Sequence, residues 1–170
     1  MKIKKISLKN HRGFSLIEII VYVAIFSILV VVLASFLNSI TSTRLHSQIV
    51  LEVNDQGSSA IKTIAQTLRN ASSVNSPTMG SIASSLSVLT VSPATSPTVF
   101  SESGGVLYIT EGSGSPVALT NNKVVVSNLT FSNFSRSSTP DIIKVSFTIT
   151  SISVNSPYTV NFDGSGALRK

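Results

Sequence analysis

The sequence has no cysteine and no tryptophan, and only 12% of its 170 residues are charged. The absence of cysteine excludes disulfides, thiolate catalysis and thiolate metal sites, and it leaves the redox state of the compartment open. Histidine is almost as scarce, because His11 and His46 are the two in the chain. No dense cluster of carboxylates accompanies them. The sequence therefore predicts neither a transition-metal site nor a cofactor.

Common catalytic motifs are also missing. The chain is rich in serine but has no GxSxG arrangement. Gly104-Gly105 and the GSGS at 112–115 lack the lysine and helix start of a phosphate loop, and they are predicted to be hairpin or loop glycines. Asp163 in NFDGSG is predicted to mark a turn, since a calcium loop needs several regularly spaced oxygen ligands. The sequence does not predict an enzyme.

A long apolar run dominates the N-terminal part of the chain. Residues 14 to 37, FSLIEIIVYVAIFSILVVVLASFL, contain one charged side chain, Glu18, and neither glycine nor proline. At about 1.5 Å per residue, a helix of this length exceeds the roughly 30 Å hydrocarbon core of a bilayer. The run is therefore predicted to cross a membrane.

Basic residues gather immediately before this run, and they are Lys2, Lys4, Lys5, Lys9 and Arg12. They carry most of the formal charge of +6, because the chain from Phe14 onward has eight basic and seven acidic residues. Such a cluster keeps the N-terminus in the cytoplasm and sends the following part outward. We expect a single-pass inner-membrane protein with an extracytoplasmic head.

Composition divides the chain into a basic leader (1–13), a transmembrane helix (14–37), an amphipathic helix continuing into the head (38–75) and a β-rich globular head (76–170). No proline occurs between 14 and 76, so the two helical segments are predicted to be continuous. Gly57 is the predicted site of a soft spot or bend. The apolar face of the amphipathic helix is predicted to contain Ile49, Val53, Ala60, Ile61, Ile64, Ala65 and Leu68.

Short alternating runs after residue 77 predict strands, at 86–92, 105–110, 123–132, 142–152 and 158–162. Ile143, Val145, Phe147 and Ile149 should share one face of a sheet, as should Leu129 and Phe131. A sheet with one solvated face is usually antiparallel. The expected fold class is α+β, with a long N-terminal helix packed on a C-terminal antiparallel sheet.

The start of the helix, RGFSLIEIIVYVAIFSILVVV, resembles the signal of the type IV pilin and type II secretion pseudopilin superfamily. The matching features are a short basic leader ending in Gly13, an aromatic Phe14 after it, and Glu18 at the fifth position of the mature chain. The resemblance implies a pilin-like fold. It also implies that prepilin peptidase cleaves between Gly13 and Phe14 and that Phe14 is N-methylated.

The resemblance gives Glu18 a role in subunit assembly, as the partner of the α-amino group of a neighbouring subunit. A carboxylate inside a spanning helix costs roughly 2.5–3.5 kcal/mol on insertion scales, so it is usually functional. The implied partners are prepilin peptidase, the inner membrane and other pilin or pseudopilin subunits, contacted through the N-terminal helix. The stretch LIEIIVYVAIFSIL is most similar to J-type minor pseudopilins and minor pilins, and Ser35 stands where major pilins often have proline.

Two alternatives stay open at this point. Val32-Leu33-Ala34 offers a conventional signal-peptide cleavage site before Ser35, which would release a secreted or cell-surface binding domain. An uncleaved chain would be a plain membrane anchor. Nucleic acid is not an expected partner, because the basic residues of the head are scattered, at Lys123, Arg136, Lys144, Arg169 and Lys170. The sequence does not specify whether the filament would serve secretion, motility, adhesion or DNA uptake.

Overall fold

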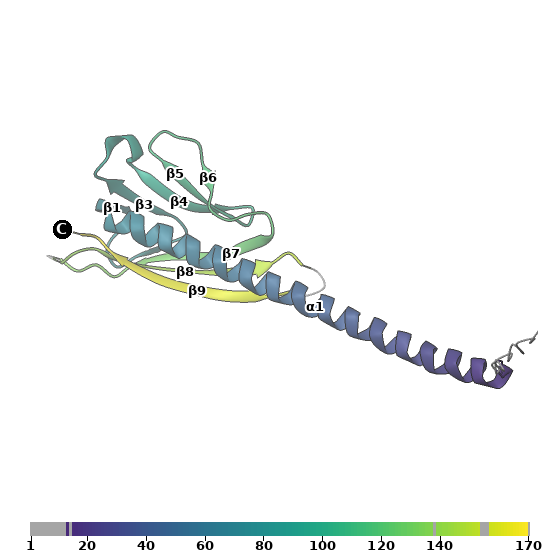
Figure 1. Cartoon of the computed structure of the whole chain (residues 1–170). Coiled ribbons are helices and arrows are strands. Elements are labelled where there is room, and N and C mark those ends of the chain that lie inside the picture. Colours follow the sequence, from purple (N-terminus) through teal and green to yellow (C-terminus); the bar gives the residue numbers. More distant parts are fainter. Residues whose placement is uncertain (1–12, 14, 138, 154–156, 170) are drawn as a thin grey trace, which may run out of the picture. The chain divides into compact units, whose positions relative to one another are not determined.

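A computed structural model describes residues 13, 15–137, 139–153 and 157–169. The leader residues 1–12 and Phe14 lie outside these ranges. The chain separates into two compact units, which divide between Arg44 and Leu45. The first helix, α1 (Leu16–Arg69, 54 residues), contributes to both units. Figure 1 labels α1 and all the strands except β2.

In the first unit, α1 begins with the Glu18 and Ile19 amides donating to the Ser15 carbonyl, at 3.0 and 3.2 Å. Its residues are mainly isoleucine, valine and leucine, whose side chains are exposed from Leu16 to Leu37. Ser27 and Ser35 donate their hydroxyl protons to the carbonyl oxygens of Val23 (2.7 Å) and Val31 (3.0 Å). Apolar side chains and internally satisfied polar groups are what a helix in lipid requires.

In the second unit, α1 presents its predicted apolar face to the core, with Val53, Ala60, Ile64 and Leu68 buried. The helix ends at Arg69, earlier than the amphipathic segment expected to reach residue 75. Strand β1 (Ala71–Ser76) follows at once and pairs with β3 (Leu86–Thr90). Serines 72 and 73 and Val74 have low helix propensity, so strand pairing determines the local structure.

Two antiparallel sheets complete the second unit. The five-stranded sheet has the order β1-β3-β4-β5-β6, with β4 at Thr98–Ser103, β5 at Val106–Glu111 and β6 at Val117–Ala118. The four-stranded sheet has the order β2-β7-β8-β9, with β2 at Ile82–Ala83, β7 at Val124–Asn133, β8 at Ile142–Ser151 and β9 at Thr159–Ala167. A short 3-10 helix occupies Pro93–Thr95. Antiparallel pairing and the α+β class are as predicted, although two sheets replace one.

The core of this unit is shared by α1 and both sheets. The predicted alternation on β8 is confirmed, because Ile143, Val145, Phe147 and Ile149 are all buried. Leu129 and Phe131 of β7 are buried with them, as predicted. The five-stranded sheet contributes Leu86, Val88, Phe100 and Leu107 to the same cluster. The Gly104-Gly105 pair links β4 to β5 as a two-residue hairpin with φ of 60° and 80°, which confirms the prediction for these glycines.

Glycines allow α1 and β9 to approach closely. Gly57 of α1 is buried under the ring of Phe162, and a Cβ built on Gly57 would collide with that ring. On the strand, a Cβ on Gly164 would lie 2.7 Å from Ile61 Cγ2, and one on Gly166 would lie 2.7 Å from Leu68 Cδ1. Each element therefore inserts side chains over glycines of the other.

This packing corrects two predictions. Gly57 lies inside an uninterrupted helical segment, and the ring of Phe162 packs against it. A soft spot or bend was predicted there. The NFDGSG stretch is the central part of β9, whereas a turn was predicted there. Its glycines are explained by contact with α1, and this contact is invisible in the local sequence.

Candidate functional site

Gly13 and Glu18 are the two expected site residues that the structure describes, and Phe14 falls outside the described residues. Gly13 is exposed, and a Cβ built on it would meet no described atom within 4 Å. The backbone at Gly13 is accessible to another molecule. The assignment of the cleavage and methylation sites to Gly13 and Phe14 stays a prediction.

Glu18 lies in the first turn of α1, where a carboxylate interacts favourably with the helix dipole. Its Oε1 accepts a hydrogen bond from the Tyr22 hydroxyl at 3.3 Å, one helical turn further on. Both side chains are exposed on the surface of the first unit. The polar pair stands within a segment whose other large side chains are apolar.

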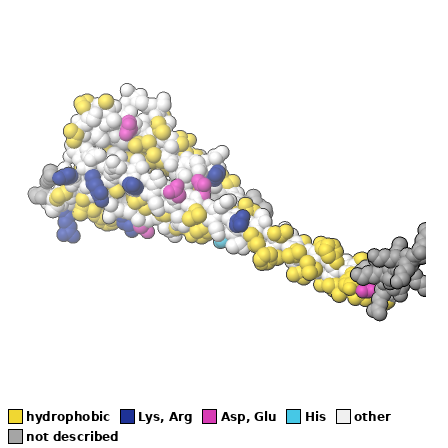
Figure 2. Space-filling model, viewed as in Figure 1, with side chains coloured by type: hydrophobic (Ala, Val, Ile, Leu, Met, Phe, Trp, Pro, Cys, Tyr) yellow, Lys and Arg dark blue, Asp and Glu magenta, His cyan; other side chains and the backbone are white. Residues whose placement is uncertain are grey.

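The segment around Glu18 matches the requirements of a bilayer. Within the described residues, α1 is the one helix long and apolar enough to cross a membrane, and its most apolar 18 residues have a mean hydropathy of 3.0. None of that window is buried against other parts of the chain. Figure 2 shows apolar side chains covering the visible face of this segment, with an acidic side chain near its start. The surface is suited to lipid or to other helices.

A polar network joins α1 to the segment between β6 and β7 in the second unit. Asn121 Nδ2 donates to Glu52 Oε1 at 2.6 Å, and the Asn121 backbone amide donates to Gln56 Oε1 at 3.3 Å. Lys123 Nζ lies 3.6 Å from Glu52 Oε2. The Asn121 hydrogen bond, helped by the Lys123 charge, holds the pKa of Glu52 below its ordinary value against the opposing effect of burial. Glu52 is half-buried.

Two lysines of the head are paired with carboxylates. Lys123 is paired with Glu52, and Lys144 Nζ lies 3.2 Å from Asp163 Oδ1. Lys144 and Ser146 hold the pKa of Asp163 below its ordinary value through hydrogen bonds. Arg169 instead lines a shallow depression of about 460 Å³ with Arg69 at the end of α1. Figure 2 shows Lys and Arg side chains toward that end of the head. Lys170 lies outside the described residues.

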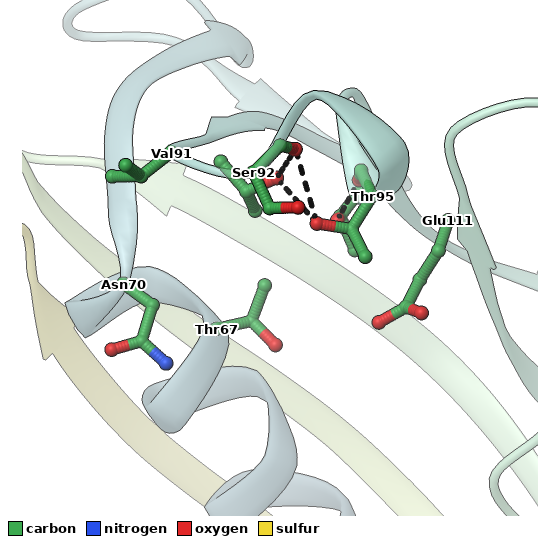
Figure 3. Close-up of a pocket in the computed structure, with 8 residues that line it drawn as sticks. Thr67, Asn70, Val91, Ser92, Thr95 and Glu111 are labelled. Carbon is green, nitrogen blue, oxygen red and sulfur yellow. Dashed lines mark hydrogen bonds between the residues drawn. The ribbon is translucent and has the colours of Figure 1, made fainter.

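A second depression, of about 280 Å³, adjoins the end of α1. Figure 3 shows Thr67 of α1 and Asn70, which follows the helix, on one side and Ser92 and Thr95 on the other, with Glu111 at the edge. Several of its hydroxyls are already hydrogen-bonded to one another or to backbone, such as Thr98 Oγ1, which donates to the Thr95 carbonyl at 2.7 Å. In the described ranges, no group of three or more His, Asp or Glu side chains could hold a metal.

Comparison with known proteins finds one match. The family described as "Prokaryotic N-terminal methylation motif" matches residues 8–34. No curated protein and no solved structure matches the chain. The motif covers Gly13, Phe14, Glu18 and the start of α1. It supports the type IV pilin-like superfamily, processing by prepilin peptidase and membrane anchorage through the apolar helix.

Tyr22 is the residue near this site that sequence reasoning missed. Its position four residues after Glu18 places the two side chains on one helical face. That spacing is visible in the sequence, but tyrosine in an apolar run is easily read as one more large hydrophobic residue. The structure shows that its hydroxyl reaches the carboxylate.

Proposed function

We propose that this chain is a structural subunit, of the minor class, in a type IV pilus or type II secretion pseudopilus. Prepilin peptidase cleaves after Gly13, Phe14 becomes the methylated N-terminus, and Glu18 pairs with the α-amino group of a neighbouring subunit. The observation that carries the proposal is the methylation motif at residues 8–34, which coincides with the start of an exposed apolar helix. The head lies outside the cytoplasm, as the basic leader favours.

Gly13 supports the cleavage step. All nine glycines lie in the described ranges, and the other eight have either a positive φ or atoms that a Cβ would crowd. Gly13 has neither, so the described fold places no demand for glycine at this position. A peptidase must approach the backbone at its cleavage site, and a residue without a Cβ favours that approach.

Glu18 supports the assembly step. An α-amino group has a pKa near 8, so a new N-terminus close to Glu18 carries positive charge at neutral pH. Opposite charges attract strongly in a low-dielectric helix bundle, and an unpaired charge there is costly. Pairing between neighbouring subunits satisfies both groups.

The minor class is supported by the backbone near Ser35. α1 passes through this position without interruption, and the Ser35 hydroxyl donates to the Val31 carbonyl. No proline is available to open the helix here. A minor subunit should be present in sheared filaments at a small fraction of the main subunit, which quantitative mass spectrometry measures.

Mass spectrometry of the mature N-terminus tests the processing step. We expect methylated Phe14 in the wild type and retained leader in Gly13→Leu, whose Cβ would meet no described atom within 4 Å. A mature chain that starts at Ser35 would replace the proposal with a secreted binding domain. An unprocessed Met1 would leave a plain membrane anchor.

A further inference from the structure

The hydrogen bond between Tyr22 and Glu18 has a directional basis. Long side chains on an α-helix lean toward its N-terminus and cover the preceding turn. Tyr22 lies one turn after Glu18, so its phenol extends back over the carboxylate, at 3.3 Å from Oε1. A tyrosine one turn before Glu18 would lean away from it. The order Glu18 then Tyr22 is the one that brings the two groups together.

Among the residues that the structure describes, Tyr22 is the hydrogen-bond partner of the Glu18 carboxylate. Ser27 and Ser35 use backbone carbonyls of their own helix as acceptors, at 2.7 and 3.0 Å. A carboxylate has no such option, because it can only accept hydrogen bonds. The Tyr22 hydroxyl supplies a donor, and hydrogen bonds to charged groups are stronger than those between neutral groups.

The bond also leaves part of the carboxylate available. Tyr22 donates to Oε1, which leaves Oε2 without a hydrogen-bond donor among the described residues. We propose that Tyr22 is a positioning residue for assembly. It fixes the Glu18 side chain on one helical face and leaves Oε2 for the α-amino group of the neighbouring subunit. This inference rests on the proposed function, in which Glu18 makes that pair.

A different role for Tyr22 would be that of an aromatic anchor at the membrane surface. An anchor depends on the depth of the ring in the bilayer, whereas positioning depends on the helical face of the hydroxyl. Val21 and Val23 separate the two roles, because both are exposed and lie within one residue of Tyr22 in depth. A tyrosine at 21 lies three residues after Glu18 and shares its face, and one at 23 points elsewhere.

The test compares full-length Tyr22→Phe, Val21→Tyr/Tyr22→Phe and Val23→Tyr/Tyr22→Phe with the wild type in cells that assemble the filament. Three quantities are measured: membrane insertion, the mature N-terminus, and the fraction of the chain recovered in sheared filaments. Ser27→Ala is the control, since it removes a hydroxyl that donates only to its own helix backbone at 2.7 Å.

We expect Tyr22→Phe to insert and be cleaved normally but to enter filaments about three- to tenfold less, as loss of one hydrogen bond predicts. The Val21→Tyr double variant should restore incorporation, and the Val23→Tyr double variant should not. Unchanged incorporation of Tyr22→Phe, equal rescue at both positions, or a defect in insertion or cleavage would overturn the inference. A wild type that is neither cleaved nor incorporated would instead refute the proposed function, and this inference with it.

Discussion

Substitution of Gly57 by alanine distinguishes two interpretations of this glycine, because they predict changes of opposite sign in the free energy of unfolding. If Gly57 were a soft point in the helix, alanine would stabilise the head by about 1 kcal/mol, the difference in helix propensity. In the structure, however, the new Cβ would fall on the ring of Phe162. We therefore expect the free energy of unfolding to decrease.

The size of this decrease depends on the contacts that Phe162 loses when the new methyl group displaces its ring. Inserting a methyl group into a packed contact costs about 1–3 kcal/mol. Phe162 is also stacked on Phe147, with ring centroids 5.6 Å apart and an interplanar angle of 20°. Displacing the ring weakens a contact of about 0.5–1.5 kcal/mol. Because Phe162 is only half-buried and can move partly outward, the expected net loss is about 1 to 3 kcal/mol after the helix gain.

The assay is urea unfolding of the full chain in detergent, followed by circular dichroism, for the wild type and Gly57→Ala in two backgrounds. In Phe162→Ala the ring is gone, so Gly57→Ala should now stabilise by about 1 kcal/mol. Ser58→Ala, at an exposed neighbouring position, controls for helix propensity and should change stability by a few tenths of a kcal/mol. Stabilisation by Gly57→Ala in the wild-type background, or the same effect in both backgrounds, would refute the packing argument.

Three further predictions concern β9 and the polar network. Gly166→Ala should destabilise the head by about 1–3 kcal/mol in urea unfolding, because its Cβ would lie 2.7 Å from Leu68 Cδ1, whereas the outward-facing Ser165→Ala should be near neutral. Asn121→Ala should cost about 1 kcal/mol at neutral pH, measured the same way, and no loss would show that its 2.6 Å bond to Glu52 is dispensable. The lowered pKa of Glu52 means that its contribution is complete above the ordinary glutamate range and disappears as pH falls through the folded-state value. The difference in free energy of unfolding between Asn121→Ala and the wild type should therefore disappear in acid. A difference that stays constant with pH would contradict this linkage.

Regular periodicity explains which parts of the head could be predicted. β8 alternates without interruption from Ile143 to Ile149, and each inward position is buried. The alternation in β7 is interrupted, because Val124 and Val126 are buried at even-numbered positions whereas Leu129 is buried at an odd-numbered one. A bulge between Ser127 and Thr130, with Asn128 at φ 54°, moves the inward-facing positions from even to odd residue numbers. The break in alternation at an asparagine is a sequence signal for such a bulge.

Strands that depend on partners could not be predicted in the same way. β1 has the sequence ASSVNS, which alone favours a loop, and it becomes a strand by pairing with β3. β9 extends to Ala167, five residues beyond the predicted end, through glycines that suggested a turn. Those glycines belong in a strand because Ile61 and Leu68 of α1 pack over them. The decisive contacts connect segments about 100 residues apart.

The N-terminal segment, by contrast, could be interpreted largely from the sequence, and the glycines show why. Glycine is needed at position 57 because the Phe162 ring of β9 packs against it, so the role of Gly57 depends on the folded structure. Around Gly13, a Cβ would meet no described atom, so nothing in the described fold explains that residue. A peptidase that binds an extended segment recognises residues by their order along the chain. The recognition signal then consists of the leader, Gly13, Phe14 and Glu18 in that order. Membrane insertion likewise depends on the length and polarity of a continuous run. A linear signal survives in the sequence, whereas a packing contact becomes visible only after folding.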